Sequence, residues 1–398
     1  MQLVHPIIVV PGVTATNLRD LYPMPPDTLW SLLTHEFDRV ALHPENFDHE
    51  AVQPAQVVPD EAFEISYKEM VLDLRHDLSP SADRPVPVYV FSYDWRQPLE
   101  TAQAALAAFI DVVIAKTRLM RHYVADGYDG KVNLIGHSMG GMVITGCLAT
   151  GATAKKVRRV ATIVTPFRGS FNAVEKILVG TASSREREAA RLTPSLYYLL
   201  PTPQHGITID PPLPATDLFD PALWQPSVAA SIREALRLRG SKAGLDTDAN
   251  AQAILGGLLA RAKAHRQGLE SFSPKAKGFA KGDWLSVVGV GYKTRVELGV
   301  SQSDNGPEFD LSPARIADDF DGETPDWRTG DGTVPYDGAQ PAFAGEIMMK
   351  WYSPHDFGLL ELVDKGLTAV GGLHGIIPNM NALQSYLVDF FNGRLDPA

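Results

Sequence analysis

The sequence predicts an α/β fold in which a mostly parallel central sheet is flanked by helices. Three observations support this prediction. Short apolar runs rich in β-branched residues recur, longer segments with helical spacing separate them, and one run passes into a helix through a glycine-bounded turn. Strands that alternate with helices are typical of a parallel sheet covered on both faces. The runs predicted as strands are residues 6–10, 88–93, 131–135, 157–164, 284–290 and 346–351.

Several segments carry helical patterns. Residues 99–122 are rich in alanine and keep helical spacing, and a further helix is predicted over residues 139–149, directly after the turn. Shorter helical patches lie at 228–238 and 250–269. In residues 381–391 the apolar side chains recur at i, i+3, i+4, i+7 and i+8, which gives a helix one apolar face. These side chains are Leu383, Tyr386, Leu387, Phe390 and Phe391.

Two regions interrupt this alternation. Residues 14–85 are rich in proline, histidine and acidic residues, and residues 170–282 contain several proline-rich pieces. Open α/β sheets bind ligands at the carboxyl ends of their strands, and insertions there commonly form a lid. We expect one domain over residues 1–398, with cap or lid insertions at about 14–85 and 170–282. An independent second domain at 170–282 is the alternative, but the strand at 284–290 resumes the same sheet and favours a cap.

Composition narrows the class of protein. The chain has 398 residues, a formal net charge of −11 and no dense run of basic residues, which argues against a nucleic-acid partner. Its single cysteine, Cys147, has apolar neighbours, cannot form an intrachain disulfide and is expected to be buried. The most apolar stretch, residues 104–115, contains Asp111 and is too short to span a bilayer. We expect a soluble, cytoplasmic protein by default, with secretion left open because a signal peptide could have been removed.

Residues 132–146, VNLIGHSMGGMVITG, suggest a reactive serine. Ser138 stands between Gly136 and Gly140, at the junction of a predicted strand and a predicted helix. In a G-x-S-x-G turn of this kind the serine has strained backbone angles and an exposed hydroxyl, and the glycines avoid collisions of a Cβ with the neighbouring strand or helix. The alternative is a glycine-rich turn in which Ser138 only caps the helix.

A nucleophilic serine needs an acid and a base, which follow in the order Ser, Asp or Glu, His in α/β-hydrolases. The best acid is Asp331, which lies between two glycines in TGDGTVP, although an ordinary Asp-Gly turn would look the same. Two histidines follow. His374 lies between glycines ahead of the last helix, whereas His355 directly follows a strand and has Asp356 beside it. The sequence therefore favours His374 over His355 as the base.

Other candidate positions surround this triad. An oxyanion hole needs two backbone N–H groups, for which the sequence offers Met139, directly after the serine, and Val13, in the loop after the first strand. His137 is expected to point away from the serine hydroxyl and to be structural. The segment 318–323 superficially resembles a calcium loop, but Ala317 replaces the first ligand and Arg328 replaces the closing glutamate. We expect no metal and no cofactor.

Four patches together resemble the lecithin:cholesterol acyltransferase family, which includes lysosomal phospholipase A2 and phospholipid:diacylglycerol acyltransferases. They are HPIIVVPGVTATNL (5–18), YDWR (93–96), IGHSMGG (135–141) and GDGTVP (330–335), and a histidine before a terminal helix completes the pattern. The resemblance covers roughly residues 5–18, 90–170 and 284–391 and does not clearly reach 170–282. It implies an α/β-hydrolase fold and lipid acyl esters as substrates. The residues that it implies are Ser138, Asp331 and His374 as triad and Val13 and Met139 as oxyanion donors.

The sequence also departs from the family. Because the chain has no cysteine pair, residues 14–48 cannot form the disulfide-stapled lid of secreted animal members. Trp30 is predicted either as a lid aromatic or as an ordinary packed residue. The segment TPFRGS (165–170) brings Phe167 and Arg168 toward the expected site, and His355 is a further candidate for the pocket lining.

The function predicted from these residues is a serine hydrolase of lipase, esterase or phospholipase type. It would cleave carboxylic esters, with lipid acyl esters favoured, through an acyl-enzyme. The expected partner is a lipid or another ester substrate, met at an interface, with no nucleic acid and no transmembrane segment. An acyltransferase that passes the acyl group to an alcohol would use the same residues and is the alternative. A binding protein built on a non-catalytic hydrolase fold is a third hypothesis, against which the intact triad argues.

Overall fold

A computed structural model describes residues 3–49, 57–180, 183–202, 206–210, 212, 217–240, 242–317, 329–357 and 372–396. Its centre is a six-stranded sheet in the order β14-β9-β7-β6-β1-β5, in which every neighbouring pair is parallel. The predicted α/β fold with a parallel central sheet is therefore confirmed. The strands are β1 (Ile7–Val10), β5 (Val88–Val90), β6 (Val132–His137), β7 (Val157–Ile163), β9 (Trp284–Gly289) and β14 (Met348–Tyr352).

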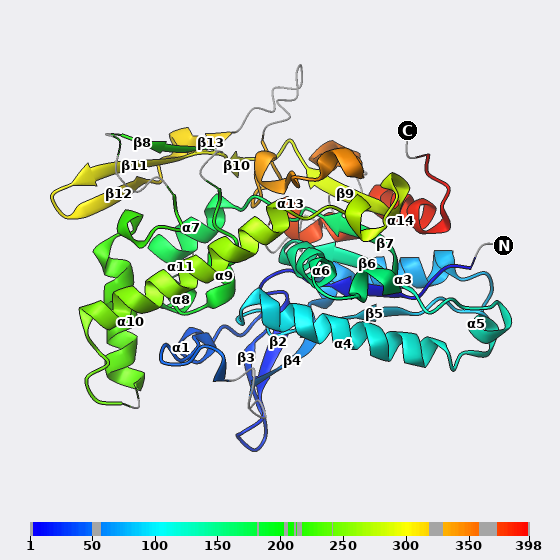
Figure 1. Cartoon of the computed structure of the whole chain (residues 1–398), viewed down its shortest axis with the longest axis horizontal. Helices are drawn as coiled ribbons and strands as arrows, with labels where there is room; N and C mark the ends of the chain where they lie inside the picture. The colour runs from blue at the N-terminus through cyan, green and yellow to red at the C-terminus, as the bar shows by residue number, and fades with distance from the viewer. Residues whose placement is uncertain are drawn as a thin grey trace.

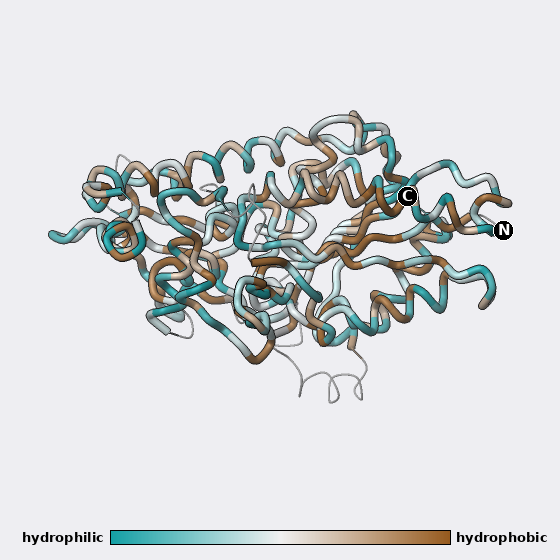
Figure 2. The backbone as a smooth tube through the Cα atoms, turned by 90° about the horizontal axis from the view of Figure 1, so that it is seen from below, coloured by the Kyte–Doolittle hydropathy of each residue, from teal (hydrophilic) through white to brown (hydrophobic). Residues whose placement is uncertain are grey.

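The strands are short apolar runs because both faces of the sheet are buried. In β1 the side chains of Ile8 and Val10 belong to one hydrophobic cluster and those of Ile7 and Val9 to the other, as the alternation of a strand requires. The tube coloured by hydropathy is correspondingly brown along the sheet, while the surrounding segments contain more teal (Figure 2). A polar residue at any of these positions would lie in a core.

Helices cover both faces of the sheet (Figure 1). Side chains of α4 (Leu99–Thr117) and α6 (Met139–Ala149) pack in the first cluster, and those of α3 (Glu64–Leu78) and α14 (Asn381–Asn392) in the second. The helix predicted over residues 99–122 is in fact two, because Met120 is extended (φ −82°, ψ 119°) and a separate α5 (Arg121–Ala125) follows it. Apolar periodicity does not register a break of this length.

Residues 14–85 contain a small antiparallel sheet as well as α3. Strand β2 (Thr16–Asp20) pairs with β3 (Asp27–Trp30) and β4 (Val57–Ala62), and a short helix α1 (Phe37–Val40) follows β3. The hairpin of β2 and β3 projects from the body of the molecule (Figure 1). In contrast, Tyr67, Met70 and Leu74 of α3 are buried against the central sheet.

The part of the chain from 170 to 282 is mainly helical and lies beside the central sheet, at the left of Figure 1. The predicted patches at 228–238 and 250–269 correspond to α10 (Pro226–Arg239) and α11 (Asp248–Glu270), so both predictions are confirmed. A parallel pair of β8 and β11 ties this part to later residues. The remaining α-helices and strands of the described residues are α7 (Phe171–Leu178), α8 (Ser184–Arg191), α9 (Pro194–Tyr198), β8 (Ile207–Ile209), β10 (Thr294–Arg295), β11 (Leu298–Ser303), β12 (Gly306–Asp310), β13 (Ile316–Ala317) and α13 (Gly372–Ile376), which contains His374.

Within the described ranges, none of the helices combines the length and the apolar character that crossing a bilayer requires. The single cysteine, Cys147, is buried in α6, as expected, and burial raises the pKa of its thiol to about 12. The side chain is therefore a small core residue and not a reactive thiol.

Candidate active site

The site lies at the point where the strand order of the sheet reverses. After β1 the chain adds β5 on one side and then returns to add β6 on the other side. Ligands of open α/β sheets bind in the crevice outside the carboxyl ends of the strands at such a switch point. The carboxyl end of β1 leads into Pro11 and Gly12, and that of β6 leads into Ser138. These two loops are close together, because a Cβ on Gly12 would lie 2.9 Å from Ser138 Cβ.

Ser138 occupies the predicted strand–turn–helix junction. Its backbone has φ 54° and ψ −129°, a region that costs a non-glycine residue free energy, and its amide is held by the carbonyl of Ile163 in β7 at 2.8 Å. The hydroxyl does not cap helix α6. Ser138 occupies the N-cap position of α6, as the alternative interpretation expected, but its side chain makes no capping hydrogen bond, so the hydroxyl is available for another partner.

The two glycines that flank Ser138 are required by close contacts. A Cβ on Gly140 would collide with the carbonyl oxygen of Val10, and a Cβ on Gly136 would lie 2.7 Å from Gly141 Cα. The predicted collisions with a neighbouring strand and helix are thus present. The sharp turn of the chain at Ser138 depends on both positions having no side chain.

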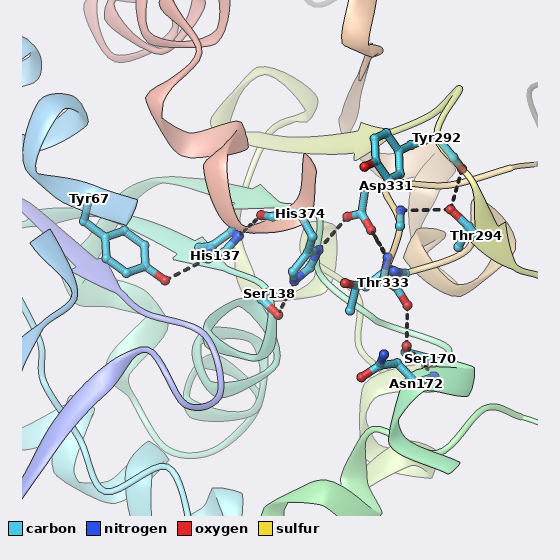
Figure 3. A network of polar contacts seen from close by, with 12 residues as sticks. Tyr67, His137, Ser138, Ser170, Asn172, Tyr292, Thr294, Asp331, Thr333 and His374 are labelled. Carbon is cyan, nitrogen blue, oxygen red and sulfur yellow. Dashed lines mark hydrogen bonds and ion pairs between the residues drawn. The ribbon is translucent and has the colours of Figure 1, made fainter. Parts of the chain in front are cut away.

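The structure brings together the three residues predicted as the triad (Figure 3). His374 Nδ1 lies 2.6 Å from Asp331 Oδ2, and His374 Nε2 lies 2.8 Å from Ser138 Oγ. Because a carboxylate oxygen only accepts hydrogen bonds, Nδ1 carries the ring proton and Nε2 presents its lone pair to the serine hydroxyl. The residues are 6% (Ser138), 1% (Asp331) and 9% (His374) exposed, so little bulk water reaches them.

The carboxylate of Asp331 is fixed by its own tight loop. Its Oδ1 accepts hydrogen bonds from the amides of Thr333 at 2.9 Å and Val334 at 2.7 Å, which leaves Oδ2 for His374. Gly332 has φ 94°, and its amide donates to Thr294 Oγ1 at 2.8 Å. The predicted glycine-flanked loop is present and orients the side chain as a base-holding acid requires.

Two backbone amides are candidates for holding a negative charge near Ser138. Met139 begins α6, where amides have no partner within the helix, and Val13 follows Gly12. In the described part of the chain neither amide donates a hydrogen bond. The loop is held in shape after Val13, because Thr14 has φ 60° and its carbonyl accepts a 2.7 Å hydrogen bond from Trp30 Nε1.

His137 points away from the serine, as predicted, and makes contacts that the sequence did not reveal. Its Nδ1 lies 2.8 Å from Tyr67 Oη, and its Nε2 lies 2.9 Å from the carbonyl oxygen of His374. Burial, together with the neighbouring His374, lowers the pKa of His137 to about 3. The ring is therefore neutral at physiological pH, and Tyr67 is a site-adjacent residue that was missed. Its only signal in the sequence was the helical spacing of apolar residues from Tyr67 to Leu78.

The four residues predicted to line a pocket lie in different surroundings. Trp30 packs against His35, Phe37 and Trp95, and Phe167 is buried against Phe343 in an edge-to-face contact. Arg168 is partly exposed in the loop after β7, and His355 is exposed in a turn after β14. None of the four lines the 580 Å³ cavity between α3 and the β2–β3–β4 sheet, which includes Leu33, Phe63 and Ile376. Their role in binding stays a prediction.

The described residues contain no group of three or more histidine, cysteine or carboxylate side chains arranged to hold a metal ion. The segment 318–323, whose sequence superficially resembles a calcium loop, lies outside the described residues. The chemistry that the site offers is that of a buried serine, an imidazole and a carboxylate in series.

Fold and site together define the class. A parallel sheet with a sharp strand–serine–helix turn at its switch point is the architecture of an α/β-hydrolase. Residues 83–215 match the family model of lecithin:cholesterol acyltransferase, so the family resemblance predicted from the sequence is confirmed. The matched residues include YDWR (93–96) and the serine turn.

A solved structure agrees on the fold. The chain is similar to a protein in the crystal structure of the Tle4–Tli4 complex, with a TM-score of 0.65, 16% identity and coverage of 98% of this chain and 99% of that one. A second similarity is to Bacillus licheniformis lipase BlEst2 in its mature form, with a TM-score of 0.34, 13% identity and coverage of 87% of this chain and 84% of that one. A search of curated proteins gives no match.

Proposed function

We propose that the protein is a serine hydrolase that cleaves carboxylic esters through an acyl-enzyme, with Ser138 as nucleophile, His374 as general base and Asp331 as the orienting acid. One observation carries the proposal. An unbroken hydrogen-bonded series runs from Asp331 Oδ2 through both nitrogens of His374 to Ser138 Oγ, at 2.6 and 2.8 Å. This geometry lets the imidazole take the hydroxyl proton as the oxygen attacks.

In the proposed acylation step, Ser138 Oγ forms a bond to the ester carbonyl carbon and its proton passes to His374 Nε2. Asp331 stabilises the resulting imidazolium. The amides of Val13 and Met139 hold the oxyanion, and each such donor contributes roughly 3 kcal/mol in well-studied hydrolases. The carbon–oxygen bond to the leaving alcohol then breaks, and His374 returns the proton to that alcohol.

Deacylation repeats the steps with a second nucleophile. Water gives its proton to His374 and attacks the acyl-enzyme, the bond to Ser138 breaks as His374 returns that proton to Ser138 Oγ, and a carboxylic acid leaves. An alcohol in place of water would give a new ester, which is the acyltransferase alternative. Two observations support acyl transfer as an alternative. They are the match to the lecithin:cholesterol acyltransferase family and the small exposure of Ser138.

We further propose that the ester is a lipid. The family match supports an acyl lipid substrate. Large apolar side chains are also exposed at the tip of the projecting hairpin, between β2 and β3: Leu21 is 49%, Tyr22 79% and Met24 100% exposed. Exposed apolar side chains clustered at one projecting tip are typical of surfaces that meet lipid or another apolar partner.

The proposal also covers the domain organisation of the chain. We propose one α/β-hydrolase domain in which residues 14–85 and 170–282 form cap insertions. Supporting this, α11 of the second region packs on α6, the helix that begins at the serine turn. The buried Arg266 of α11 also donates hydrogen bonds to the carbonyls of Tyr198 and Leu200, which ties the helices of this region together.

A fluorophosphonate probe followed by peptide mass spectrometry tests the proposal directly. A serine hydrolase should become labelled at Ser138 and lose turnover of a p-nitrophenyl ester in proportion. A chain that neither reacts with the probe nor cleaves esters of any length would instead be a binding protein. Product analysis with and without an acceptor alcohol then separates hydrolysis from acyl transfer.

A further inference from the structure

Behind the triad, four groups form a second hydrogen-bonded series, of which Figure 3 shows Tyr67, His137 and His374. The amide of Gly12 lies 3.0 Å from Tyr67 Oη, Tyr67 Oη lies 2.8 Å from His137 Nδ1, and His137 Nε2 lies 2.9 Å from the carbonyl oxygen of His374. Tyr67 is 2% exposed and His137 is 4% exposed, so water does not compete for these contacts.

Every bond in this series has only one allowed direction. A carbonyl oxygen can only accept, so His137 Nε2 carries the ring proton. Because the buried ring is neutral, its Nδ1 must accept, and the Tyr67 hydroxyl therefore donates to it. The Tyr67 oxygen is then free to accept from the Gly12 amide, which can only donate. Burial raises the pKa of Tyr67, which keeps the hydroxyl protonated.

The two ends of the series belong to the two halves of the proposed site. Gly12 directly precedes Val13, the proposed oxyanion donor, and the Cβ position of Gly12 lies 3.3 Å from Ser138 Oγ. The carbonyl at the other end belongs to His374, the proposed base. The connecting side chains come from α3 and β6, so the series joins four separate segments of the chain.

We propose that Tyr67 and His137 are positioning residues that set the oxyanion loop and the general base at a fixed separation. The inference rests on the proposed function and adds a role for two residues that do not touch the reacting atoms. Preorganised donors accelerate a reaction because they need no rearrangement as charge develops, so a loosened loop or base should lower kcat more than it weakens substrate binding.

The test compares Tyr67→Phe with Tyr123→Phe. Both remove one buried hydroxyl and keep the ring, but Tyr123 Oη donates to the carbonyl of Val4, before the start of β1, at 2.8 Å. Tyr67→Phe should lower kcat for a soluble ester about tenfold or more with KM changed less than about twofold. Tyr123→Phe should leave kcat close to that of the wild type. If both variants keep wild-type kcat, or if both lose it equally, the positioning role is wrong.

Two substitutions of His137 separate this role from a loss of folding. His137→Gln keeps a donor near the Nε2 position, whereas His137→Leu fills a similar volume and keeps none. Gln should retain about tenfold more kcat than Leu, at matched melting temperatures. Equal rates for the two would overturn the proposal.

A measurement that does not depend on catalytic turnover distinguishes this proposal from the proposed function. In protein labelled with ¹⁵N-histidine, the proton on His374 Nδ1 should give a low-field signal because of its short bond to Asp331. The signal should shift or broaden in Tyr67→Phe and stay in place in Tyr123→Phe. A wild type that cleaves no ester but shows this pattern would refute the hydrolase and retain only the structural link from Tyr67 through His137 to His374. An unmoved signal in Tyr67→Phe would refute the positioning role alone.

Discussion

Asp331 holds His374 through the main chain as well as through its side chain. The carbonyl oxygen of Asp331 accepts a hydrogen bond from the His374 amide at 3.1 Å, while Oδ2 accepts one from Nδ1 at 2.6 Å. Two bonds between the same pair of residues restrict both the position and the rotation of the imidazole. Asp331 therefore supports the His374 ring at two points, which is the arrangement that the proposed general base needs.

Removing the proposed nucleophile should abolish turnover without unfolding the protein. Ser138→Ala deletes only Oγ at a buried position, and loss of a triad member typically costs about 10⁴-fold or more in kcat. The measurement is ester cleavage together with fluorophosphonate labelling, and Ser301→Ala on an exposed strand position is the matched control. More than a few per cent of activity in a folded Ser138→Ala protein would identify another nucleophile.

Asp331→Asn should be nearly as harmful although it preserves shape. The amides of Thr333 and Val334 both donate to Oδ1, so the amide oxygen of an asparagine must take that place. Its NH₂ group would then face His374 Nδ1 and force the proton onto Nε2, where no lone pair remains for the serine. We expect kcat to fall about 10⁴-fold near neutral pH, with little change in melting temperature. Asp304→Asn, in an exposed turn, is the control, and turnover within tenfold of the wild type would exclude this role for Asp331.

The two late histidines should differ sharply. His374 lies within hydrogen-bonding distance of Asp331 and Ser138, whereas His355 is exposed in a separate turn. His374→Ala should remove nearly all turnover, by about 10⁴-fold, and His355→Ala should cost at most several-fold. Ester hydrolysis under matched folding controls ranks them. The opposite order would transfer the role of general base to the loop after β14.

The apolar tip of the β2–β3 hairpin should matter only for aggregated substrates. In the double variant Tyr22→Ser, Met24→Ser, two side chains that would enter a lipid surface become polar, which should weaken binding to vesicles about tenfold or more. Rates on a soluble short-chain ester should stay unchanged while rates on vesicle-borne lipid fall. Leu119→Ser is the control, because Leu119 is 85% exposed and lies in another part of the surface. Equal rates on both substrates for variant and wild type would remove the hairpin from lipid recognition.

Stability should fall as the solution is acidified, in part because of buried His265. Burial lowers its pKa to about 3, so between pH 6.5 and 3 the unfolded chain binds a proton there that the folded chain does not. The stability that this histidine contributes is present above pH 6.5 and declines by about 1.4 kcal/mol per pH unit below it. In His265→Gln, the free energy of unfolding measured with urea should change less with pH than in the wild type, by about that amount per pH unit. The difference between variant and wild type should be constant above pH 7, and a difference that stays constant down to pH 4 would contradict the assignment.

The central sheet and the serine turn were predictable because their signals are local. Fully buried parallel strands must be apolar along their length, as in β6 and β9, and the glycines beside Ser138 follow from contacts that any such turn makes. The grouping of Asp331 and His374 required only the chain order of one fold class. For each strand, turn or loop, the residues that predict it are neighbours in the sequence.

The positions of Tyr67 and of the small sheets were not predictable in the same way. Strand β2, TNLRD, is half polar because only part of it is buried, so its alternation is weak. Tyr67 looks like any apolar residue of a helix, and its hydroxyl acquires a role only when α3 meets Gly12 and His137. Such contacts join residues 55 and 70 positions apart and leave no periodic trace in the sequence.

The pairing of β7 with β9 has a consequence for folding during synthesis. Val160 pairs with Trp284, so the middle of the sheet cannot close until the long intervening stretch has left the ribosome. Ser138 is synthesised 236 residues before the histidine that it contacts. A nascent chain therefore carries an inert serine and an open, apolar strand edge for most of its synthesis, a state that is prone to aggregation. Activity should thus appear only with release of the nearly complete chain, and recovery of esterase activity should be the last event when the denatured protein refolds.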